Sequence, residues 1–547
     1  MDERSAVERF AANAVVLRVL AEQIRAPRHL RDLCLVSRFF HSEFIVYLYR
    51  ELDTPIERLR PANPHVVHTR SLVARSCAER RDNDHDAFNE VAQGWILKMP
   101  LLETFFWPDP YDLRKPTMEL LRKSCPRIKG IHLDYLNTDG LAALYFPRPG
   151  PIMRTWHHNL SAFKNLESLT LNHLGGSLPA WRAHLAQVLM DSPNLKALDL
   201  SLSGMTIRQM YPGPEYDLRW FDRLCDDYGT RGGVPLKLRS LRCGHAVFPL
   251  SHSSLTRLVD LAHLEEVDIC NKNVNWGGRT IEQIYRSRHS RSGITFESFG
   301  PRHCPRLRRF SAHRYGEDVY EYLRAVAAEP AFARQLAVCI AGMGSRSTGD
   351  SAVFFKASPK HPGFPLRPRM VEVELNREKI EWFAHCDATG TPAKTIFDVI
   401  ANSNGTNLEG LTLQMHNEQW SARFLELPSL EPALRRMSRL KQLAYNPFVA
   451  SRQALGRAAQ AGVPREIVLG AAHRFATAAP ALEYVGMYRQ FWRVKRHDNG
   501  YVEMVELQRS EWRAVELFYQ SCWNLHRFPN WGVPDSVDWP NLYQAFE

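Results

Sequence analysis

One stretch of the chain has residue types and spacing that could bind a phosphate group. The string GSRSTGDS at 344–351 follows an apolar run at 336–340, and its two glycines have the spacing of a P-loop. A P-loop needs a lysine directly after the second glycine to reach the phosphates, and Asp350 at that position would repel them. We therefore reject nucleotide binding and interpret 342–369, which is rich in Gly, Ser and Pro, as a loop insertion.

The other reactive side chains lack the spacing that catalysis or metal binding requires. The sequence contains no His-Glu-x-x-His, no zinc-type Cys/His spacing and no Gly-x-Ser-x-Gly. Ten cysteines in 547 residues, without a Cys-x-x-Cys pair, are too few for a disulfide scaffold, so we interpret them as small buried hydrophobes in a reducing compartment. We expect no catalytic residue, no metal and no cofactor, and therefore no enzyme.

The composition is that of a globular chain, with 44% apolar and 24% charged residues. No window approaches eighteen uninterrupted apolar residues, which argues against a membrane span. The start of the chain, residues 1–4, lacks the basic segment and apolar run of a secretory signal. We expect the protein in the cytoplasm, the nucleus or both.

The net charge of +11 is unevenly distributed. Between Arg286 and Arg314 there are eight arginines and one acid, Glu297. A basic face of this kind could bind phosphate, an acidic peptide or an acidic partner protein equally well. No recognisable nucleic-acid module accompanies it, so nucleic acid is the least favoured of these partners.

A short strand pattern recurs ten times, and these strands must position the functional side chains of the protein. The pattern, called the frame below, is Leu-x-x-apolar-x-apolar, as in Leu166-x-x-Leu169-x-Leu171. Its copies begin at Leu102, Ile128, Leu166, Leu195, Leu238, Leu264, Leu307, Leu408, Leu440 and Leu482. Between the seventh and eighth copies the frame is lost, although 336–340 and 371–375 read as degenerate strands.

The residues ahead of the frames indicate a helix that ends before each strand. Five frames carry proline two residues ahead of the first apolar position, where it would stop a helix. These prolines are Pro100, Pro126, Pro193, Pro305 and Pro480. Helical periodicity precedes several frames, at 117–124, 180–190, 319–328 and 392–401. A unit of helix, stop and short strand cannot cover its own apolar face, so it must stack on copies of itself.

This array resembles the leucine-rich-repeat superfamily, in its irregular intracellular form. The resemblance implies an α/β solenoid over 99–490, with short parallel strands and helices on the convex side. The alternative is an unrelated α/β domain with parallel strands. If the frame is correct, the polar residues within and after it line the concave face and bind a target protein. These residues are His132, Asp134, Thr170, Asn172, Asp199, Arg242, Glu266, Asp268, Arg309, His313, Gln414 and Tyr484.

The N-terminal segment carries a second resemblance. The string HLRDLCLVSRFF at 29–40 is similar to the core of an F-box, and the apolar residues at 16–24 recur at helical spacing like its first helix. The segment 48–52 is similar to the closing segment of fungal F-box proteins, whereas Ala12-Asn13 stand where the family has Leu-Pro. We expect an all-α F-box-like module over 1–55, followed at 56–98 by a linker or a degenerate first repeat. Alternatively, these helices simply cap the open end of the solenoid.

An F-box with leucine-rich repeats implies a substrate receptor of a Skp/cullin/F-box ubiquitin ligase. The module would bind the Skp-family adaptor and link the chain to the cullin-RING ligase, while the repeats would hold an unknown target. The residues expected to bind the adaptor are Leu17, Leu20, Ile24, Leu30, Leu33, Val36 and Phe40. The competing hypothesis is a leucine-rich-repeat scaffold without a ligase link.

The end of the chain, 491–547, differs from the repeats in its residue pattern and aromatic content. Two strand-like runs, 490–494 and 501–507, flank His-Asp-Asn-Gly, which predicts a hairpin with an Asn-Gly turn. Eight aromatic residues follow within 518–546. They could cover the open core of the last repeat as a cap, or fold across the concave face as a plug or as part of the binding site.

Overall fold

We analysed a computed structural model of the chain. The structure describes residues 13–24, 27–55, 63–75, 85–107, 113–134, 160, 162–174, 178–202, 219–244, 247–269, 296–312, 317–343, 369–375, 400–401, 407–415, 430–447, 465–487, 490–507 and 515. The statements below refer to these residues.

A single sheet of sixteen strands follows the chain in sequence order. Strands β1 to β14 pair in parallel, and β15 and β16 close the sheet as an antiparallel hairpin. The strands are β1 Glu51–Pro55, β2 Ser71–Arg75, β3 Thr104–Trp107, β4 Gly130–Asp134, β5 Ser168–Leu174, β6 Ala197–Leu202, β7 Ser240–Cys243, β8 Glu266–Ile269, β9 Arg309–Ala312, β10 Ala337–Met343, β11 Met370–Leu375, β12 Gly410–Met415, β13 Gln442–Pro447, β14 Tyr484–Met487, β15 Gln490–Arg496 and β16 Val502–Glu506.

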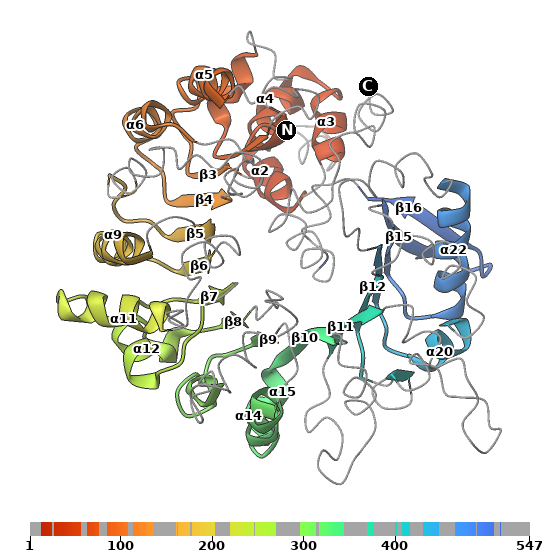
Figure 1. Cartoon of the computed structure of the whole chain (residues 1–547). Helices are drawn as coiled ribbons and strands as arrows, with labels where there is room; N and C mark the ends of the chain where they lie inside the picture. Colours follow the sequence, from red (N-terminus) through yellow and green to blue (C-terminus); the bar gives the residue numbers. More distant parts are fainter. Residues whose placement is uncertain are drawn as a thin grey trace, which may run out of the picture.

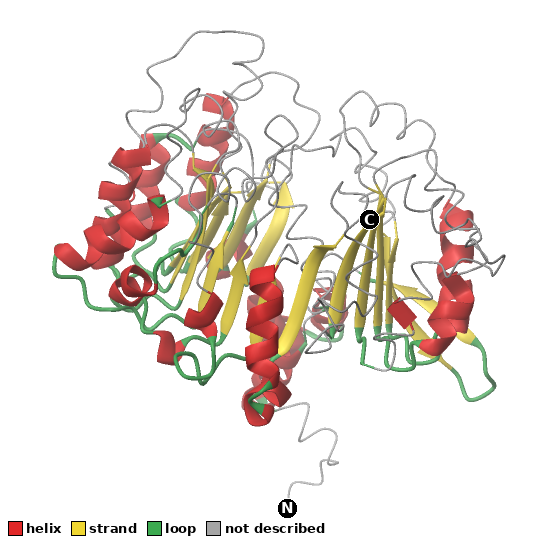
Figure 2. Cartoon of the chain, turned by 60° about the horizontal axis from the view of Figure 1, so that its bottom comes forward, coloured by secondary structure: helices red, strands yellow, loops and turns green. Residues whose placement is uncertain are grey.

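Helices flank this sheet along its outer side, except for the first three described helices, which form a separate bundle at its N-terminal end (Figure 1). They are α2 Ala14–Gln23, α3 Pro27–Cys34, α4 Arg38–Leu48, α5 His85–Ile96, α6 Lys115–Ser124, α9 Leu178–Met190, α11 Trp220–Thr230, α12 His252–Leu258, α14 Glu317–Ala327, α15 Pro330–Gln335, α20 Leu430–Arg436 and α22 Arg465–Ala478, with 3-10 turns η2 Pro64–His68, η4 Leu261–His263 and η5 Phe296–Phe299. The strands line the inside of an arc, and the helices from α5 onward lie on its outside (Figure 1). Described loops run along one edge of the sheet (Figure 2).

The repeated frame forms the core. Each of the ten predicted frames coincides with a strand, and its three apolar side chains are buried, with Ile128 the most exposed at 8%. One continuous hydrophobic cluster therefore runs from Leu52 in β1 to Val502 in β16. The predicted α/β solenoid is confirmed, because each unit covers the apolar face of its neighbour.

The turn before most strands also repeats. Within the described residues, the backbone N–H of the first residue in seven of the ten frames donates to the carbonyl three residues earlier, as Leu102 does to Met99 and Leu482 to Ala479. The predicted helix over 180–190 is α9, whose Trp181, Leu185 and Leu189 are buried in the core. The predicted helices at 117–124 and 319–328 correspond to α6 and α14, whereas 392–399 lies outside the described residues.

The sheet begins earlier than the predicted residue 99. Strand β1 lies inside the segment expected to be all-α, and β2 lies inside the segment left open as linker or repeat. The frame of β2 was not recognised because Thr69 stands at its first apolar position and Ala74 at its third. Both are nonetheless fully buried, together with Leu72 between them. Small side chains at these positions preserve the geometry but remove the leucine pattern.

The two degenerate strands and the hairpin are confirmed. Strands β10 and β11 occupy 337–343 and 370–375, and they restore the pairing where the frame is lost. The hairpin β15–β16 turns at Gly500, whose φ of +80° suits glycine. Trp492 and Val502 of this hairpin belong to the main core, so the hairpin closes the last repeat. The predicted P-loop-like string and the aromatic segment 518–546 lie outside the described residues.

Candidate protein-binding surfaces

The N-terminal module consists of three helices with a core of its own. Asn13, at the position where an F-box has proline, caps α2 by accepting hydrogen bonds from the backbone of Val15 at 3.1 Å and Val16 at 3.2 Å. Ser37 caps α4 in the same way. The buried core comprises Leu17, Ala21, Leu30, Cys34, Phe44 and Ile45. Ala12-Asn13 in place of Leu-Pro is thus compatible with an N-terminally capped first helix.

The structure divides the residues that we expected to bind the adaptor. Leu17 and Leu30, exposed by 1% and 5%, hold the three helices together, so their assignment to a contact surface is corrected. Three more of the set lie partly buried against the same core: Ile24, Leu33 and Phe40. Only Leu20 and Val36 are exposed. In a bundle this small the periodic apolar residues pack between the helices. The sequence alone could not distinguish these buried residues from apolar residues on an outer face.

The module exposes apolar side chains beyond Leu20 and Val36, and sequence reasoning missed these others. Its exposed apolar residues, called the module patch below, come from α2 and from the α3–α4 corner. They are Val15, Val19, Leu20, Leu35, Val36 and Phe39, with Leu35 78% and Val36 64% exposed. In the rest of the described chain the exposed large apolar residues are Val67, Leu97, Val234, Ile467 and Tyr501, spread over more than four hundred residues. This concentration in one module makes these residues a candidate interaction site.

The module rests on the first repeat through Tyr49. This residue packs against both the module core and the solenoid core, and its hydroxyl accepts a 2.8 Å hydrogen bond from Asn63. The rings of His65 and Tyr49 lie 5.5 Å apart and those of His41 and His65 5.6 Å apart. The helices therefore cover part of the solenoid's N-terminal end, while the module patch remains exposed.

On the concave side, the sheet register joins predicted target-binding residues into one row. His132, Thr170, Asp199, Arg242 and Asp268 are successive cross-strand partners on β4 to β8. Neighbouring strands lie about 4.8 Å apart, so the row spans about 19 Å. Thr170 and Asp199 are buried, at 7% and 5% exposure, whereas the other three are half-buried. In the second half of this row, Asp199, Arg242 and Asp268 carry alternating negative and positive charges.

His132 is held between two hydroxyl groups. Its Nδ1 lies 2.8 Å from Thr170 Oγ1 and its Nε2 lies 3.2 Å from Ser168 Oγ. A serine beside an imidazole can be activated as a nucleophile, but acyl transfer also needs backbone N–H groups aimed at the developing oxyanion. The N–H groups of β4 and β5 are engaged in a parallel sheet. This arrangement suits hydrogen-bonded recognition of a partner surface.

The remaining predicted concave residues are more dispersed. Glu266 and Arg309 are cross-strand partners in the neighbouring row, and Asn172 accepts a 3.3 Å hydrogen bond from Ser201. Asp134 belongs to β4 and Gln414 to β12, but their side chains lie outside the described set, as does His313 altogether. Tyr484 lies on β14, where the Arg493 guanidinium approaches its ring centroid at 5.8 Å.

Toward its C-terminal end the concave side becomes apolar and covered. Cys339 of β10 is the cross-strand partner of Ser311, which follows Asp268 in the polar row, so it faces the same side. It forms a separate buried cluster with Met370, Ala444, Phe491, Leu507 and Val515. Leu507 and Val515 come from the segment after β16. These two residues therefore pack on the concave side of the sheet, whereas the aromatic segment 518–546, for which a cap and a plug were the alternatives, lies outside the described residues.

A row of charged residues that sequence reasoning missed lies at the edge where the strands begin. In each repeat the residue after the first frame position donates its N–H to the same position of the preceding repeat, as Lys196 does to Glu167 and Glu167 to Lys129. This edge row contains Arg50, Arg70, Glu103, Lys129, Glu167, Lys196, Arg239, Glu265, Arg308, Ala337, Arg369, Glu409, Lys441 and Glu483. The signal becomes visible only when the frames are aligned.

Much of the edge row is neutralised by ion pairs. Glu167 lies 3.2 Å from Lys129 and 2.6 Å from Lys196, and hydrogen bonds from these two ammonium groups, that of Lys196 first, lower its pKa. Arg70 and Glu103 approach to 3.4 Å. At the other end of the row Glu409 pairs with Arg369 and, at 3.1 Å, with Arg439. Partly exposed pairs of this kind contribute little stability each but favour one register.

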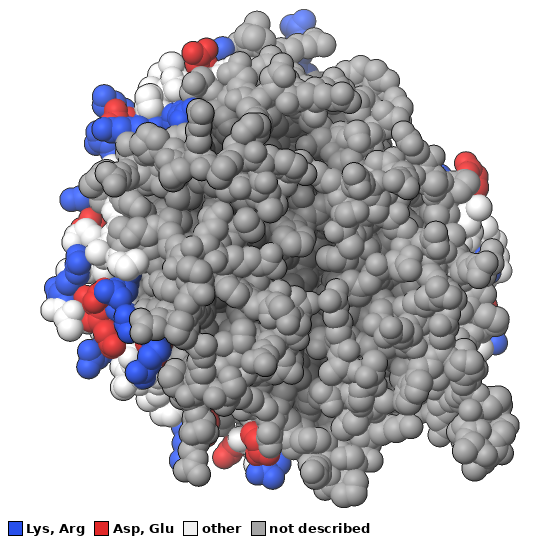
Figure 3. Space-filling model, viewed as in Figure 1, with Lys and Arg blue, Asp and Glu red and all other residues white. Residues whose placement is uncertain are grey.

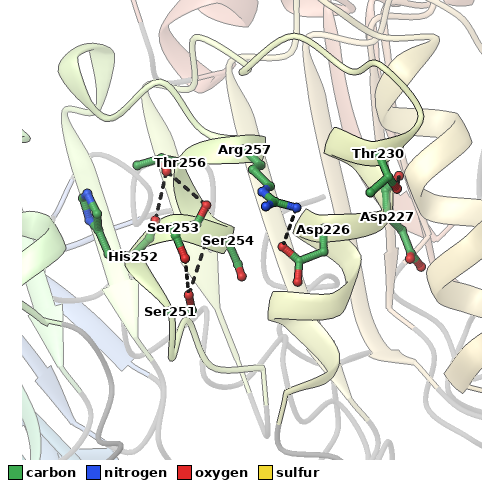
Figure 4. A network of polar contacts seen from close by, with 9 residues as sticks. All are labelled: Asp226, Asp227, Thr230, Ser251, His252, Ser253, Ser254, Thr256 and Arg257. Carbon is green, nitrogen blue, oxygen red and sulfur yellow. Dashed lines mark hydrogen bonds and ion pairs between the residues drawn. The ribbon is translucent and has the colours of Figure 1, made fainter.

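The outer helices carry their own polar contacts. Ser251 caps the short helix α12, and Arg257 of that helix lies 3.4 Å from Asp226 of α11 (Figure 4). Asp222 of α11 accepts backbone hydrogen bonds from Leu250 and Ser251, and burial raises its pKa to about 6. Along the outer rim the described basic and acidic side chains are interspersed (Figure 3).

Within the described residues, no group of three His, Cys, Asp or Glu side chains is placed to hold a metal ion. No described helix is long and apolar enough to cross a membrane.

Comparison with known proteins finds solved structures that match at low similarity. No protein-family model matches the chain, and no curated protein matches it. A chain of the Rad7 and Elc1 complex in yeast matches with 11% identity and a TM-score of 0.26, covering 87% of this chain and 87% of that one. The leucine-rich repeat-containing protein LegL7 from Legionella pneumophila matches with 9% identity and a TM-score of 0.25, covering 79% and 92%. Both scores are low, so the class, a leucine-rich-repeat solenoid, rests on the strand register and the repeated core.

Proposed function

We propose that the protein is a non-catalytic substrate-recognition subunit of a Skp/cullin/F-box ubiquitin ligase. The module patch carries this proposal. It lies on three helices whose sequence at 29–40 is similar to an F-box, and it leaves Leu35, Val36 and Phe39 exposed. Burying an exposed valine or leucine against a partner contributes about 1.5–3 kcal/mol, so a few such residues supply a specific contact.

The target would bind the polar half of the concave side, on β4 to β9. There the half-buried His132, Arg242 and Asp268 offer hydrogen bonds and charge along one row, with Glu266 and Arg309 beside them. A rigid sheet holds these side chains at fixed spacing, as recognition of a protein surface requires. Further along the same side, Cys339, Met370 and Ala444 are buried in a cluster with Leu507 and Val515.

Capture of a purified Skp-family adaptor by the immobilised full-length protein tests the proposal. Val36→Asp places a charge in the module patch without disturbing the module core, and we expect it to reduce capture at least about tenfold. Val234→Asp is the matched control, because Val234 is 75% exposed on the solenoid. If the unsubstituted protein captures no adaptor, or if both variants capture as well as it does, the chain is a leucine-rich-repeat scaffold without a ligase link.

A further inference from the structure

The edge row is not neutralised along its whole length. At one end of the row the ion pairs described above lie between residues 70 and 196, and at the other end between residues 369 and 439. Between them Arg239, Glu265 and Arg308 are successive members of the row, and within the described residues neither arginine forms an ion pair. Glu265, half-buried between them, contacts neither guanidinium within 4 Å.

Further cations gather at the same edge. Arg302 and Arg306 lie in the turn that leads into β9, and Lys237 precedes β7. Gln335 at the end of α15 donates hydrogen bonds to the carbonyls of Pro305, at 2.9 Å, and Leu307, which holds Arg334 beside that turn. All six cations are exposed, and none forms an ion pair with a described carboxylate. They are called the basic sector below: Lys237, Arg239, Arg302, Arg306, Arg308 and Arg334.

We propose that the basic sector binds an acidic polypeptide segment, rich in Asp and Glu, of a partner protein. Arg239 and Arg308 lie two strands apart, or about 10 Å. An extended peptide presents every second side chain toward one side, about 7 Å apart, so alternate carboxylates can reach successive cations. Arginine favours this partner because its planar guanidinium binds a carboxylate through two parallel hydrogen bonds.

The surroundings of the sector favour a peptide over single-stranded nucleic acid. Proteins that bind single strands stack the bases on exposed aromatic rings. Among the described residues, the exposed Phe, Tyr and Trp side chains are Phe39 and Tyr501, which lie far along the chain from the basic sector. The exposed ring of His303, next to Arg302, already packs against the ring of His252, with 4.5 Å between the ring centroids. The site is separate from the concave side, so it does not depend on the proposed ligase function.

Fluorescence polarisation with the full-length protein tests this site. The probe is labelled decaglutamate, with decaglutamine and a ten-nucleotide oligothymidylate for comparison. We expect decaglutamate to bind, decaglutamine not to bind, and affinity to fall as NaCl rises from about 50 to 300 mM. The double variant Arg306→Gln/Arg308→Gln should weaken binding at least about tenfold, because two charge-assisted contacts are lost. Both arginines are exposed, so their removal leaves the core intact.

The matched control is Lys129→Gln/Lys196→Gln, which removes two paired cations from the same edge. It should change decaglutamate affinity less than about twofold. Absence of decaglutamate binding at low salt, or equal losses in the two double variants, overturns the proposal. Tighter binding of the oligothymidylate with the same arginine dependence would overturn it too and assign the sector to nucleic acid.

Discussion

The packing of Val515 on the concave side gives a prediction that can be measured at a neighbouring thiol. Val515 is 2% exposed and shares a cluster with Cys339, which is 4% exposed. Val515→Ala removes two methyl groups from this cluster, which corresponds to about 1.5 kcal/mol of burial. If Cys339 reacts only when the segment after β16 detaches, its alkylation rate should rise about tenfold, since 1.4 kcal/mol changes an equilibrium constant tenfold.

Site-resolved mass spectrometry after a short pulse of iodoacetamide provides the assay. Cys304 is the internal control, because it is fully buried in the main core and unconnected with Val515. Its alkylation should stay at the rate found in the unsubstituted protein. An unchanged rate at Cys339 would show that Val515 does not cover the concave side. Equal acceleration at Cys339 and Cys304 would indicate general unfolding and would refute the local explanation.

Two further predictions concern stability. Burial raises the pKa of Asp222 from 3.8 to about 6, so between these pH values the folded state binds a proton that the unfolded state lacks. The free energy of unfolding should therefore gain about 1 kcal/mol from Asp222 as the pH falls from 7.5 to 5, and lose it as the pH rises through 6. Urea unfolding at both pH values should show that Asp222→Asn abolishes this contribution, and an unchanged pH dependence would contradict the assignment. Arg496 donates hydrogen bonds to the carbonyls of Ala476, Ala479 and Leu482 at 2.8 Å each, so Arg496→Met should lower the unfolding free energy of the C-terminal repeat by about 2 kcal/mol. Amide hydrogen exchange should become faster in α22 but not in α9. An equal acceleration of exchange in the two helices would rule this out.

Much of the fold follows from the sequence because a solenoid repeats one local solution. Frames such as Leu195/Leu198/Leu200 combine the alternation of a buried strand with a helix stop ahead of it, and no other part of the chain is needed to recognise them. The pattern failed at β2, where buried Thr69 and Ala74 keep the shape of the frame without its leucines. Stacking on neighbouring strands then determines the structure, although the local pattern is weak.

The candidate surfaces were harder to predict, since they depend on which apolar residues remain uncovered. Leu17 and Val36 both fit the F-box-like pattern, yet one is buried and the other exposed. Likewise, an alternation such as Lys129, Glu167 and Lys196 has no signature along the chain, because about thirty residues separate successive members of the edge row. Cross-strand neighbours of this kind become visible only once the register is known.

Titration calorimetry of the full-length protein with a purified Skp-family adaptor tests the proposed function most directly. We predict one adaptor per chain and a negative heat-capacity change, as the burial of the module patch requires. Val36→Asp should remove the heat of binding, and Val234→Asp, at an exposed valine on the solenoid, should leave it unchanged. Binding that persists in Val36→Asp, or an unsubstituted protein that releases no heat with the adaptor, would contradict the substrate-receptor function.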